Sequence, residues 1–499
     1  MSLILRKLCE CLLHEHFGSI VTEVAAELFK HGTRTLSQIT SSVKIPSVKI
    51  KEAMCVLVKF GFVMYEPTDR GLIYTLETDK IVTILRYPKY MYHVKLIIGD
   101  EAEMMLEEVL KSGYESASQI IVKTYQRLEH LPPERRATVP VLKEKFELLL
   151  QHQYLLRSLS SETLSDLPTD KPDFSLPDLN IKAITRLTQG YEADAGDKKI
   201  YWRVNIDRFN EDLRDQILVN AITRRIDDKA GELMRQLLYI MSIRTAAWSD
   251  TSIPIPLNDI RESIRKNVPH LIPHLDQYMS LIVDDSSQFI QRVGDSGGGQ
   301  YSINIREAFY QLAWATIEHI VMERFGSKAS RIFRLIRSYK YIDQEKIQHV
   351  AMLGSKEAKL LTFNLMEEKY LQIQELKKLG VTTGPTKIFF LFHIDINQVV
   401  RMTIEHCYHS LYNIIQRRGH EVNSNKRMID KELRMQTLTI NMKEHGAPEE
   451  QLAEIADMMT PAEKIQLEQV HERIKKLGSN EFCIDETLFL LEMYIRYHK

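Results

Sequence analysis

The sequence predicts a mainly α chain with small β wings, an α+β fold, and three observations lead to this class. The composition is that of a globular protein, with 44% hydrophobic and 27% charged residues and only 20 Gly and 16 Pro in 499 residues. One pattern, a buried helix face followed directly by a short strand, occurs near the N-terminus and recurs later. From residue 395 onwards, the apolar residues instead follow the heptad spacing of a coiled coil.

The first copy of the pattern lies at 46–66. Its apolar residues recur at helical spacing before Gly61 and alternate as in a strand after it: Ile50, Ala53, Met54 and Leu57, then Phe62, Val63 and Tyr65. A glycine ends a helix readily because it tolerates a positive φ. A helix that passes directly into a hairpin is typical of the third helix and the wing of a winged-helix domain.

The other elements of a first winged helix fit within 1–80. Helical spacing predicts helices at 3–17 and 19–30 and a short helix at 35–40. A turn at 67–71 then leads to a returning strand at 72–76. Since 499 residues are too many for one core, at roughly 150 residues per domain, further domains are expected.

A second copy is predicted at 81–206. Shifting the first pattern along the chain gives a helix face followed by a strand, formed by Leu142, Phe146 and Leu149 and then by Tyr154 and Leu155. The returning strand is predicted at 199–204. The residues between the two strands, 159–198, contain several prolines and many Asp and Ser residues, so we expect a mobile acidic insertion in this wing.

Two looser copies are predicted at 207–305 and 306–394. The third has helices, a glycine-rich turn at 294–299 and wing strands on either side of it, with helices at 209–226, 229–243, 257–266 and 269–283 and strands at 288–293 and 300–305. The fourth has four helices and a returning strand, at 306–325, 328–339, 343–352, 355–369 and 387–393. In the fourth copy, Leu365 and Tyr370 occupy the positions of Leu57 and Phe62.

The last segment, 395–499, is predicted to form an antiparallel coiled-coil arm. Its two seams consist of apolar residues three or four apart: Val400, Ile404, Cys407, Leu411 and Ile414 in the first, and Leu467, Val470, Ile474 and Leu477 in the second. A polar loop at 417–420 would let the seams pair. A capping box at Thr460 and Glu463 begins the last long helix. A final short helix at 485–497 is expected to fold back on the fourth domain.

The charge balance limits the possible functions. With 66 Lys and Arg against 67 Asp and Glu, the chain lacks the strong positive excess of proteins that hold nucleic acid alone, so any such contact is local or shared with partners. Five cysteines, an odd number without the dense spacing of a disulfide framework, indicate free thiols in a reducing compartment. No apolar stretch approaches the roughly 20 residues of a membrane span, so no membrane partner is expected.

Two motifs invite a catalytic or metal-binding interpretation. Residues 294–298 read GDSGG, like the nucleophile loop of a serine protease, but the segment 245–248 has Trp248 where the histidine base would stand, and the surrounding pattern is helical. Glycines at a hairpin tip explain the motif as a wing turn. The cluster of Cys9, Cys11, His14 and His16 fails as a zinc site because residues two apart on a helix point to opposite sides. We therefore predict no catalytic, cofactor-binding or metal-ligating residues.

Basic residues remain as candidates for DNA contact. Lys51 and Lys59 lie opposite the apolar face of the first recognition-type helix, with Lys44 and Lys49 nearby, where a winged helix meets DNA. Two further clusters lie on predicted helices of the third and fourth domains: Arg261, Arg265 and Lys266, and Arg331, Arg334 and Arg337 between Lys328 and Lys340. The alternative for each of these residues is an ordinary solvated helix face.

The whole chain resembles one known family. The runs VTEVAAELFKHGTRTLSQI at 21–39 and KIKEAMCVLVKFGFV at 49–63, followed by further winged-helix patterns, an acidic insertion and a helical arm, are similar to the large winged-helix subunit of RNA polymerase III. That subunit belongs to the peripheral initiation heterotrimer of the enzyme and is related to TFIIE alpha. Unlike that relative, this chain has no zinc-ribbon CxxC pair, so the resemblance implies no metal.

The resemblance implies a nuclear, non-catalytic polymerase subunit. Such a subunit assembles with two smaller subunits and docks on the clamp of the largest subunit through its arm and winged helices. It supports recruitment, opening of promoter DNA near the melted region and initiation at small-RNA genes for tRNA and 5S rRNA. The resemblance also implies participation in sensing foreign DNA.

Two other classes of protein remain as alternatives. A proteasome-lid-like scaffold also combines helices with a winged helix, but it usually places one winged helix after a helical array, whereas here the first copy begins the chain. A serine hydrolase would use Ser296 in the GDSGG run.

Overall fold

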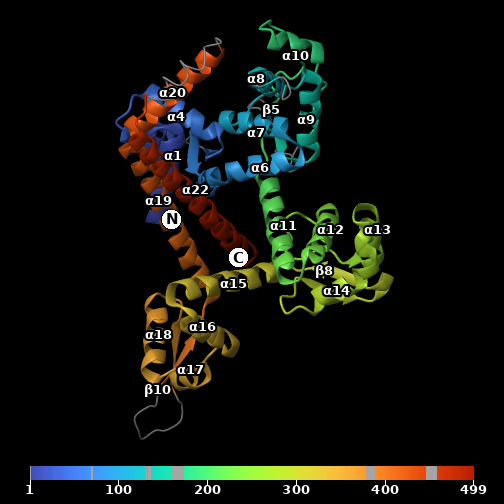
Figure 1. Cartoon of the computed structure of the whole chain (residues 1–499), viewed down its shortest axis with the longest axis vertical. Helices are drawn as coiled ribbons and strands as arrows, with labels where there is room; N and C mark the ends of the chain where they lie inside the picture. Colours follow the sequence, from blue (N-terminus) through green and yellow to red (C-terminus); the bar gives the residue numbers. More distant parts are fainter. Residues whose placement is uncertain are drawn as a thin grey trace. The chain divides into compact units, whose positions relative to one another are not determined.

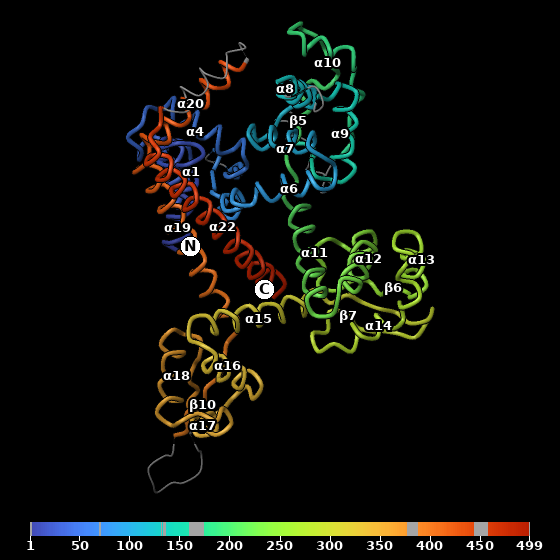
Figure 2. Tube along the Cα trace, viewed as in Figure 1, coloured from blue at the N-terminus to red at the C-terminus, as the bar shows by residue number. Residues whose placement is uncertain are grey.

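The computed structural model describes residues 2–68, 71–130, 132, 136–158, 174–377, 388–444 and 458–498 (Figure 1). The chain folds as two compact units, residues 1–213 and 214–499. The boundary between them falls within helix α11 (Ile206–Arg225), which is labelled in the chain trace of Figure 2. Among the described residues, no helix has the length and apolarity needed to cross a membrane, and no cluster of side chains is suited to hold a metal ion.

The first winged helix has the predicted elements. Four helices precede the wing, α1 (Leu3–Phe17), α2 (Ser19–His31), α3 (Leu36–Ser42) and α4 (Ser47–Lys59). The wing strands β2 (Val63–Thr68) and β3 (Gly71–Leu76) pair antiparallel, and β1 (Arg34–Thr35) adds a third strand beside β3. The predicted turn at 67–71 includes Asp69 and Arg70, which lie outside the described residues. A short helix, α5 (Thr78–Val82), and a 3-10 turn, η1 (Thr83–Arg86), follow the wing.

The face of α4 that meets the core is the one that the sequence indicates. Ile50 and Leu57 are fully buried and Ala53 and Met54 nearly so. Where α4 ends, Phe60 and Phe62 meet Phe17 of α1, with ring centroids 4.7 and 5.6 Å from that of Phe17. This burial of apolar surface, at roughly 25 cal/mol per Å², fixes which side of α4 faces solvent.

The second winged helix completes the first compact unit. Its helices are α6 (Tyr87–Ile97), α7 (Asp100–Ser112), α8 (Ala117–Glu129) and α9 (Val139–Gln151). The predicted wing is confirmed, because β4 (Leu155–Ser158) pairs antiparallel with β5 (Tyr201–Val204). Trp202 of β5 is fully buried, and it packs edge-on against Phe146 at 5.9 Å between ring centroids.

The insertion expected to be mobile at 159–198 contains regular structure in its described part, 174–198. Residues 159–173 lie outside the described residues, but the rest includes helix α10 (Ile181–Thr188), whose Ile184 is fully buried. The side chain of Asn180 caps this helix. Asp197 is also buried and accepts a 2.7 Å hydrogen bond from the Ser118 backbone N–H, so the segment packs on the domain core.

The third winged helix lies in the second compact unit, apart from the start of α11. Its further elements are α12 (Asp228–Arg244), α13 (Leu257–Asn267), α14 (Leu275–Asp284), β6 (Ile255–Pro256), β7 (Ile290–Gly294) and β8 (Gln300–Ile303), with strand order β6-β8-β7. The prediction of a single helix at 269–283 is wrong about where the helix starts. A 3-10 segment, η4 (Pro269–His274), precedes α14, because Pro273 supplies no backbone N–H for a regular helix.

The fourth winged helix contains the long helix α15 (Ile305–Phe325), then α16 (Ser327–Tyr339), α17 (Gln344–Ala351) and α18 (Ser355–Glu367). Its wing strands β9 (Gln372–Lys377) and β10 (Ile388–His393) pair antiparallel. Lys387, the first residue of the predicted returning strand, lies outside the described residues. An isolated bridge between Ile342 and Phe392 adds a short third strand position beside β10.

In the part that the structure describes, the arm contains α19 (Ile396–Ser424), α20 (Lys426–Glu444) and α22 (Pro461–Tyr497). Antiparallel pairing is confirmed by contacts that run in opposite directions along the two long helices. The Tyr494 hydroxyl donates to Asn397 (2.8 Å), and Arg473 contacts Glu421 (3.5 Å). The predicted capping box of Thr460 and Glu463 is present.

Two predictions about the arm are wrong. Residues 417–420 lie inside α19 rather than in a loop, and the chain bends at Asn425 instead. Residues 485–497 are not a separate helix but the last part of α22. This part does pack on the fourth domain, since Tyr497 stacks on Phe309 of α15 with 5.8 Å between ring centroids.

The junction between helix and wing is the same in the first, second and fourth winged helices. A residue with positive φ follows the helix, and its N–H and the next N–H close back on the last helical turn. The donor and acceptor pairs are Gly61 to Val58 (3.0 Å) and Phe62 to Leu57 (2.9 Å), Gln153 to Leu150 (2.9 Å) and Tyr154 to Leu149 (3.0 Å), and Lys369 to Met366 (2.9 Å) and Tyr370 to Leu365 (2.8 Å). These three copies of the predicted pattern thus share the same backbone hydrogen bonding at the helix-to-wing junction.

Candidate functional site

The exposed face of α4 carries the first group of candidate DNA-contact residues. Lys49 and Lys51 are exposed on this helix, and Lys44 is exposed just before it. The part of the chain that the structure describes offers these three side chains no ion pair. Three lysines without a carboxylate partner remain available to an anion, which is the condition for contact with a phosphate backbone.

Lys59, the fourth candidate on this helix, is placed differently. Its ammonium lies over the ring of Tyr114, 4.9 Å from the centroid, a cation–π contact. The backbone is close here as well, because a Cβ at Gly113 would come within 3.0 Å of the Lys59 carbonyl oxygen. Lys59 therefore helps to join the first and second winged helices, and it does not form one group with Lys49 and Lys51.

The candidates on α13 lie beside carboxylates. Arg261 contacts Asp276 at 3.2 Å, and Lys266 contacts Glu262 one turn earlier at 2.7 Å. Arg265 is exposed. Exposed ion pairs of this kind contribute only about 0–1 kcal/mol, so they can be released to a stronger partner, but they lower the local positive potential.

The candidates on α16 are used within the fourth domain. Arg331 donates to the Ala351 carbonyl (3.1 Å), and Arg334 pairs with Glu318. Arg337 donates to Gln311 (2.6 Å) and lies 4.7 Å from the ring centroid of Trp314. Lys328 is also paired, with Glu357. These contacts tie α16 to the helices around it, which weighs against a free basic surface at this position.

The residues predicted for the coiled-coil seam differ in burial. Val400 and Leu411 are fully buried, and Ile404 and Cys407 are nearly so. Burial raises the pKa of the Cys407 thiol to about 12, so this cysteine acts as a small apolar side chain. In the facing helix Leu467 and Val470 are buried. Three predicted seam residues, Ile414, Ile474 and Leu477, are only half-buried.

The GDSGG run lies at the tip of the third wing. Ser296, Gly297 and Gly298 form a single 3-10 turn, η5, between β7 and β8. Gly297 has φ 66°, a value that favours glycine, and the turn packs on the side chains of Pro256 and Leu257. The local geometry is that of a hairpin turn.

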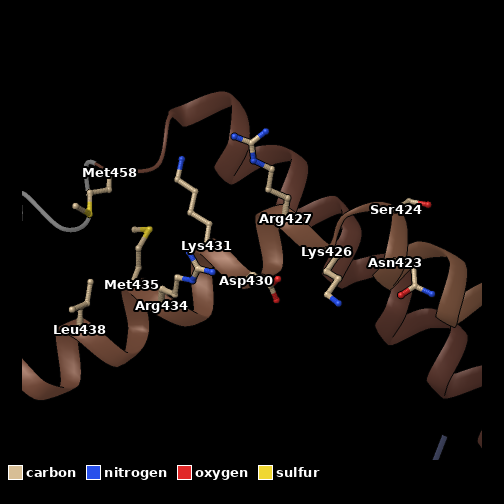
Figure 3. A pocket seen from close by; sticks show the side chains of 10 residues that line it. All are labelled: Asn423, Ser424, Lys426, Arg427, Asp430, Lys431, Arg434, Met435, Leu438 and Met458. Carbon is tan, nitrogen blue, oxygen red and sulfur yellow. The ribbon is translucent and has the colours of Figure 1, made fainter. Parts of the chain in front are cut away.

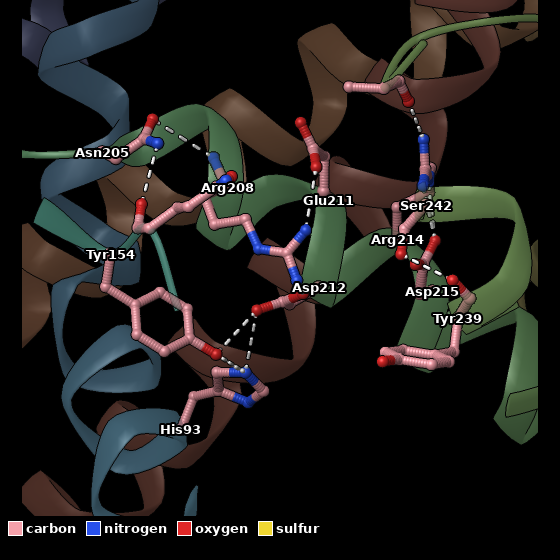
Figure 4. A network of polar contacts seen from close by, with 12 residues as sticks. His93, Tyr154, Asn205, Arg208, Glu211, Asp212, Arg214, Asp215, Tyr239 and Ser242 are labelled. Carbon is pink, nitrogen blue, oxygen red and sulfur yellow. Dashed lines mark hydrogen bonds and ion pairs between the residues drawn. The ribbon is translucent and has the colours of Figure 1, made fainter. Parts of the chain in front are cut away.

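A half-buried polar network in the first compact unit is not predicted by the sequence. Figure 4 shows Tyr154 and His93 converging on Asp212 of α11, at 2.9 and 3.2 Å. Arg208 contacts the same carboxylate at 3.0 Å. Burial alone would raise the pKa of Asp212, but the hydrogen bond from His93 and the charge of Arg208 hold it below its usual value. The network fixes the start of α11 on the second winged helix.

No sequence signal marks this network, because its members lie on α6, at the junction between α9 and β4, and on α11, with no common spacing. Tyr154 was identified only as the counterpart of Phe62 at the helix-to-wing junction. Its hydroxyl, which Phe62 lacks, is the feature that recruits the charged partners.

Models of four families match successive parts of the chain. They are the RNA polymerase III subunit RPC82 helix-turn-helix domain (residues 7–67), RNA polymerase III subunit RPC82 (102–312), the POLR3C C-terminal winged-helix domain (317–394) and the RPC3 helical hairpin domain of DNA-directed RNA polymerase III (427–490). The last of these begins just after the bend of the arm and covers nearly all of α20 and most of α22.

Curated relatives match over nearly the whole length. DNA-directed RNA polymerase III subunit RPC3 of Rattus norvegicus is 33% identical over 521 residues, which cover 98% of each chain. The subunit of the same name in Homo sapiens is 33% identical with the same coverage. A subunit rpc3 of Dictyostelium discoideum is 21% identical over 47% of this chain and 37% of its own. On this agreement along the full length, the chain belongs to the RPC3 family of RNA polymerase III subunits.

Proposed function

We propose that this chain is a non-catalytic, peripheral subunit of RNA polymerase III that acts in initiation. In this role it assembles with two smaller subunits, docks on the clamp of the largest subunit and supports recruitment and opening of promoter DNA at tRNA and 5S rRNA genes. The observation that carries the proposal is the match to RPC3 subunits over 98% of both chains. A nuclear location and a part in sensing foreign DNA follow from the same family resemblance and belong to the proposal.

The arrangement of the chain supports a division of labour within this role. We propose domain limits at 1–80, 81–206, 207–305, 306–394 and 395–499, with the winged helices and the arm serving as separate docking modules. Basic side chains on α4 and just before it suit a DNA backbone, since Lys44, Lys49 and Lys51 are exposed and have no ion pair within the described residues. The helices of the arm suit protein contact, because a paired seam holds them in a fixed geometry.

Affinity purification tests the role directly. A tagged copy of the full chain is expected to recover the polymerase III core and two smaller subunits in constant proportion. Depletion of the chain from a transcription extract should abolish initiation at a tRNA gene, and adding back the purified complex should restore it. Failure to recover polymerase subunits would overturn the proposal.

A matched variant tests the non-catalytic part. Replacing Ser296 with Ala removes the one hydroxyl of the GDSGG turn and keeps the glycines that its geometry needs. Initiation should be unchanged. A loss of initiation in Ser296→Ala, with the polymerase still bound, would instead support a chemical role for this turn.

A further inference from the structure

A groove lies at the bend of the arm, where α19 ends and α20 begins. It has a volume of about 770 Å³ and is lined by one face of α20, by the end of α19 and by Met458 just before α22 (Figure 3). Four of the α20 residues that line it are three or four apart and therefore share one side of the helix: Arg427, Lys431, Arg434 and Leu438. The groove thus extends along about three turns of α20.

Helix α20 lacks a buried face. Over residues 426–443, whose side chains the structure describes, no side chain of this helix is buried, although Leu438 and Met435 are apolar. A helix of 19 residues has little stability in water without packing, because helix propensity alone is marginal at this length. An amphipathic helix in this state is the common form of a surface that completes its packing on a partner.

The two ends of the groove differ in chemistry. Figure 3 shows Met435, Leu438 and Met458 gathered at one end, and Met458 is 60% exposed. Methionine side chains are flexible and adapt to an incoming apolar group. The remainder of the groove is basic, with Lys426, Arg427, Lys431 and Arg434 against one acid, Asp430.

One carboxylate is already bound at the edge of the groove. Lys431 contacts Glu463 of α22 at 2.9 Å, and this hydrogen bond, with that of the Thr460 N–H, lowers the pKa of Glu463 to about 2. Within the described part of the chain, the cations Lys426, Arg427 and Arg434 have no ion pair. The charge of the groove is therefore only partly neutralised, and the bound Glu463 shows which group the free cations would accept.

We propose that this groove binds an acidic segment of a partner protein whose apolar side chains enter the Met435, Leu438 and Met458 end. The inference rests on the proposed function in one respect, since it assigns the chemistry of a partner to the docking arm. Duplex DNA fits the groove less well, because its phosphate backbone offers no apolar group to the Met435, Leu438 and Met458 end. Charge complementarity and apolar burial together select the acidic, amphipathic segment.

Binding of a defined probe tests the chemistry. The probe is a synthetic helical peptide with Leu on one face and Glu on the other, labelled for fluorescence anisotropy and titrated with the full chain. Arg427→Glu together with Arg434→Glu should weaken binding by roughly tenfold or more, and added salt should weaken binding to the wild-type chain. The matched control, Arg401→Glu with Lys443→Glu, makes the same charge change at exposed arm positions outside the groove and should bind like the wild-type chain.

The apolar end has its own variant. Met435→Gln with Leu438→Gln should weaken binding of the same peptide by several-fold, whereas Ile440→Gln, an exposed residue of α20 outside the groove, should not. A Glu-to-Gln version of the peptide should bind weakly to every variant. The proposal is overturned if the groove variants bind the acidic peptide as the wild-type chain does, or if duplex DNA binds the groove and the peptide fails to compete.

Copurification separates this inference from the proposed function. If Arg427→Glu with Arg434→Glu lowers recovery of the polymerase while the control variant does not, the groove is a docking site. If both variants recover the polymerase fully, the groove inference fails and the proposed function stands. If the wild-type chain itself recovers no polymerase, the proposed function fails whatever the peptide result.

Discussion

The first and fourth winged helices share a backbone device but use their cationic residues in opposite ways. In the first, Lys49 and Lys51 extend from α4 and meet no carboxylate among the described residues. In the fourth, Arg334 and Arg337 of α16 are occupied by Glu318, Gln311 and a tryptophan ring. Spacing along one helix therefore does not indicate whether a cationic side chain is free to bind a partner. Availability depends on acceptors that other elements bring close.

The largest expected effect concerns α16. Arg337→Glu removes a hydrogen bond and a cation–π contact and places a carboxylate near the face of Trp314, so it should destabilise the fourth domain by about 2 kcal/mol. Hydrogen exchange of the α15 and α16 amides in the full chain should then be roughly thirtyfold faster where exchange needs opening of the domain. Lys51→Glu on α4 is the control and should leave the exchange of its own domain unchanged. If the α15 and α16 amides exchange at the same rate in Arg337→Glu as in the wild-type chain, the Arg337 contacts add no stability.

The next effect concerns the shared junction. Gly61 has φ 72° and open space where a Cβ would point, so Gly61→Ala should cost about 1 kcal/mol through backbone strain alone. Lys369 holds the same place in the fourth domain with φ 62°. Lys369→Gly should therefore have the opposite sign and stabilise its domain by up to about 1 kcal/mol. Amide exchange in the two wings measures both changes, and a loss of stability in Lys369→Gly would refute the common junction.

The exposed lysines of α4 and the paired arginines of α16 should differ in their effect on DNA binding. Lys49→Glu with Lys51→Glu should lower the slope of log affinity against log salt by about 2 in promoter complexes of the assembled polymerase, since each lost phosphate contact releases about one counterion fewer. Arg331→Glu, at a position where the arginine donates to a carbonyl, should leave the slope as it is. A slope unchanged in both variants would assign α4 to solvent or to a protein partner.

The smallest effect depends on pH. Tyr370 of the fourth domain stands where the first has Phe62, and burial raises the pKa of Tyr370 above its usual value, although Arg324 lowers it in part. Below pH 10 the tyrosine is protonated in both the folded and the unfolded chain, so its contribution is fully present. As the pH rises above 10, the unfolded chain loses this proton first, and stability falls.

Tyr370→Phe isolates this contribution. The variant should lose less stability than the wild-type chain between neutral pH and pH 11, as measured by amide exchange in the β9–β10 wing after correction for intrinsic rates. The equivalent residue of the first domain cannot titrate, so its wing should show no such difference between the two proteins. A pH dependence that is identical in Tyr370→Phe and wild type would contradict the assignment.

Local periodicity was sufficient to predict most of the secondary structure. The face of α4, the copy that contains Tyr154 and the copy that contains Tyr370 follow from apolar spacing, because burial selects the same side of each helix. The glycine at 61 marks only the first junction. Gln153 and Lys369 adopt the same positive φ without a glycine, so only the shifted pattern, and not residue type, could locate the other two.

The errors arise where distant residues decide the outcome. The segment at 417–420 contains Gly419 and has the composition of a loop, but Arg418 pairs with Glu481 of the facing helix α22, and this contact supports the continuation of α19. The contact of Lys59 with Tyr114 and the contacts of the α16 arginines are likewise made by residues far away in the sequence. The sequence of a single helix therefore does not predict these contacts.

Helix α22 has a mechanical consequence for the second compact unit. Its 37 residues run without interruption from the capping box at Thr460 to Tyr497 beside α15, a rod of about 55 Å. A rod of this kind conveys rotation, because one inserted residue would turn everything beyond it by about 100°. An insertion or deletion in α22 would therefore need a matching change in α19. Without it, the orientation of the groove relative to the fourth domain would change.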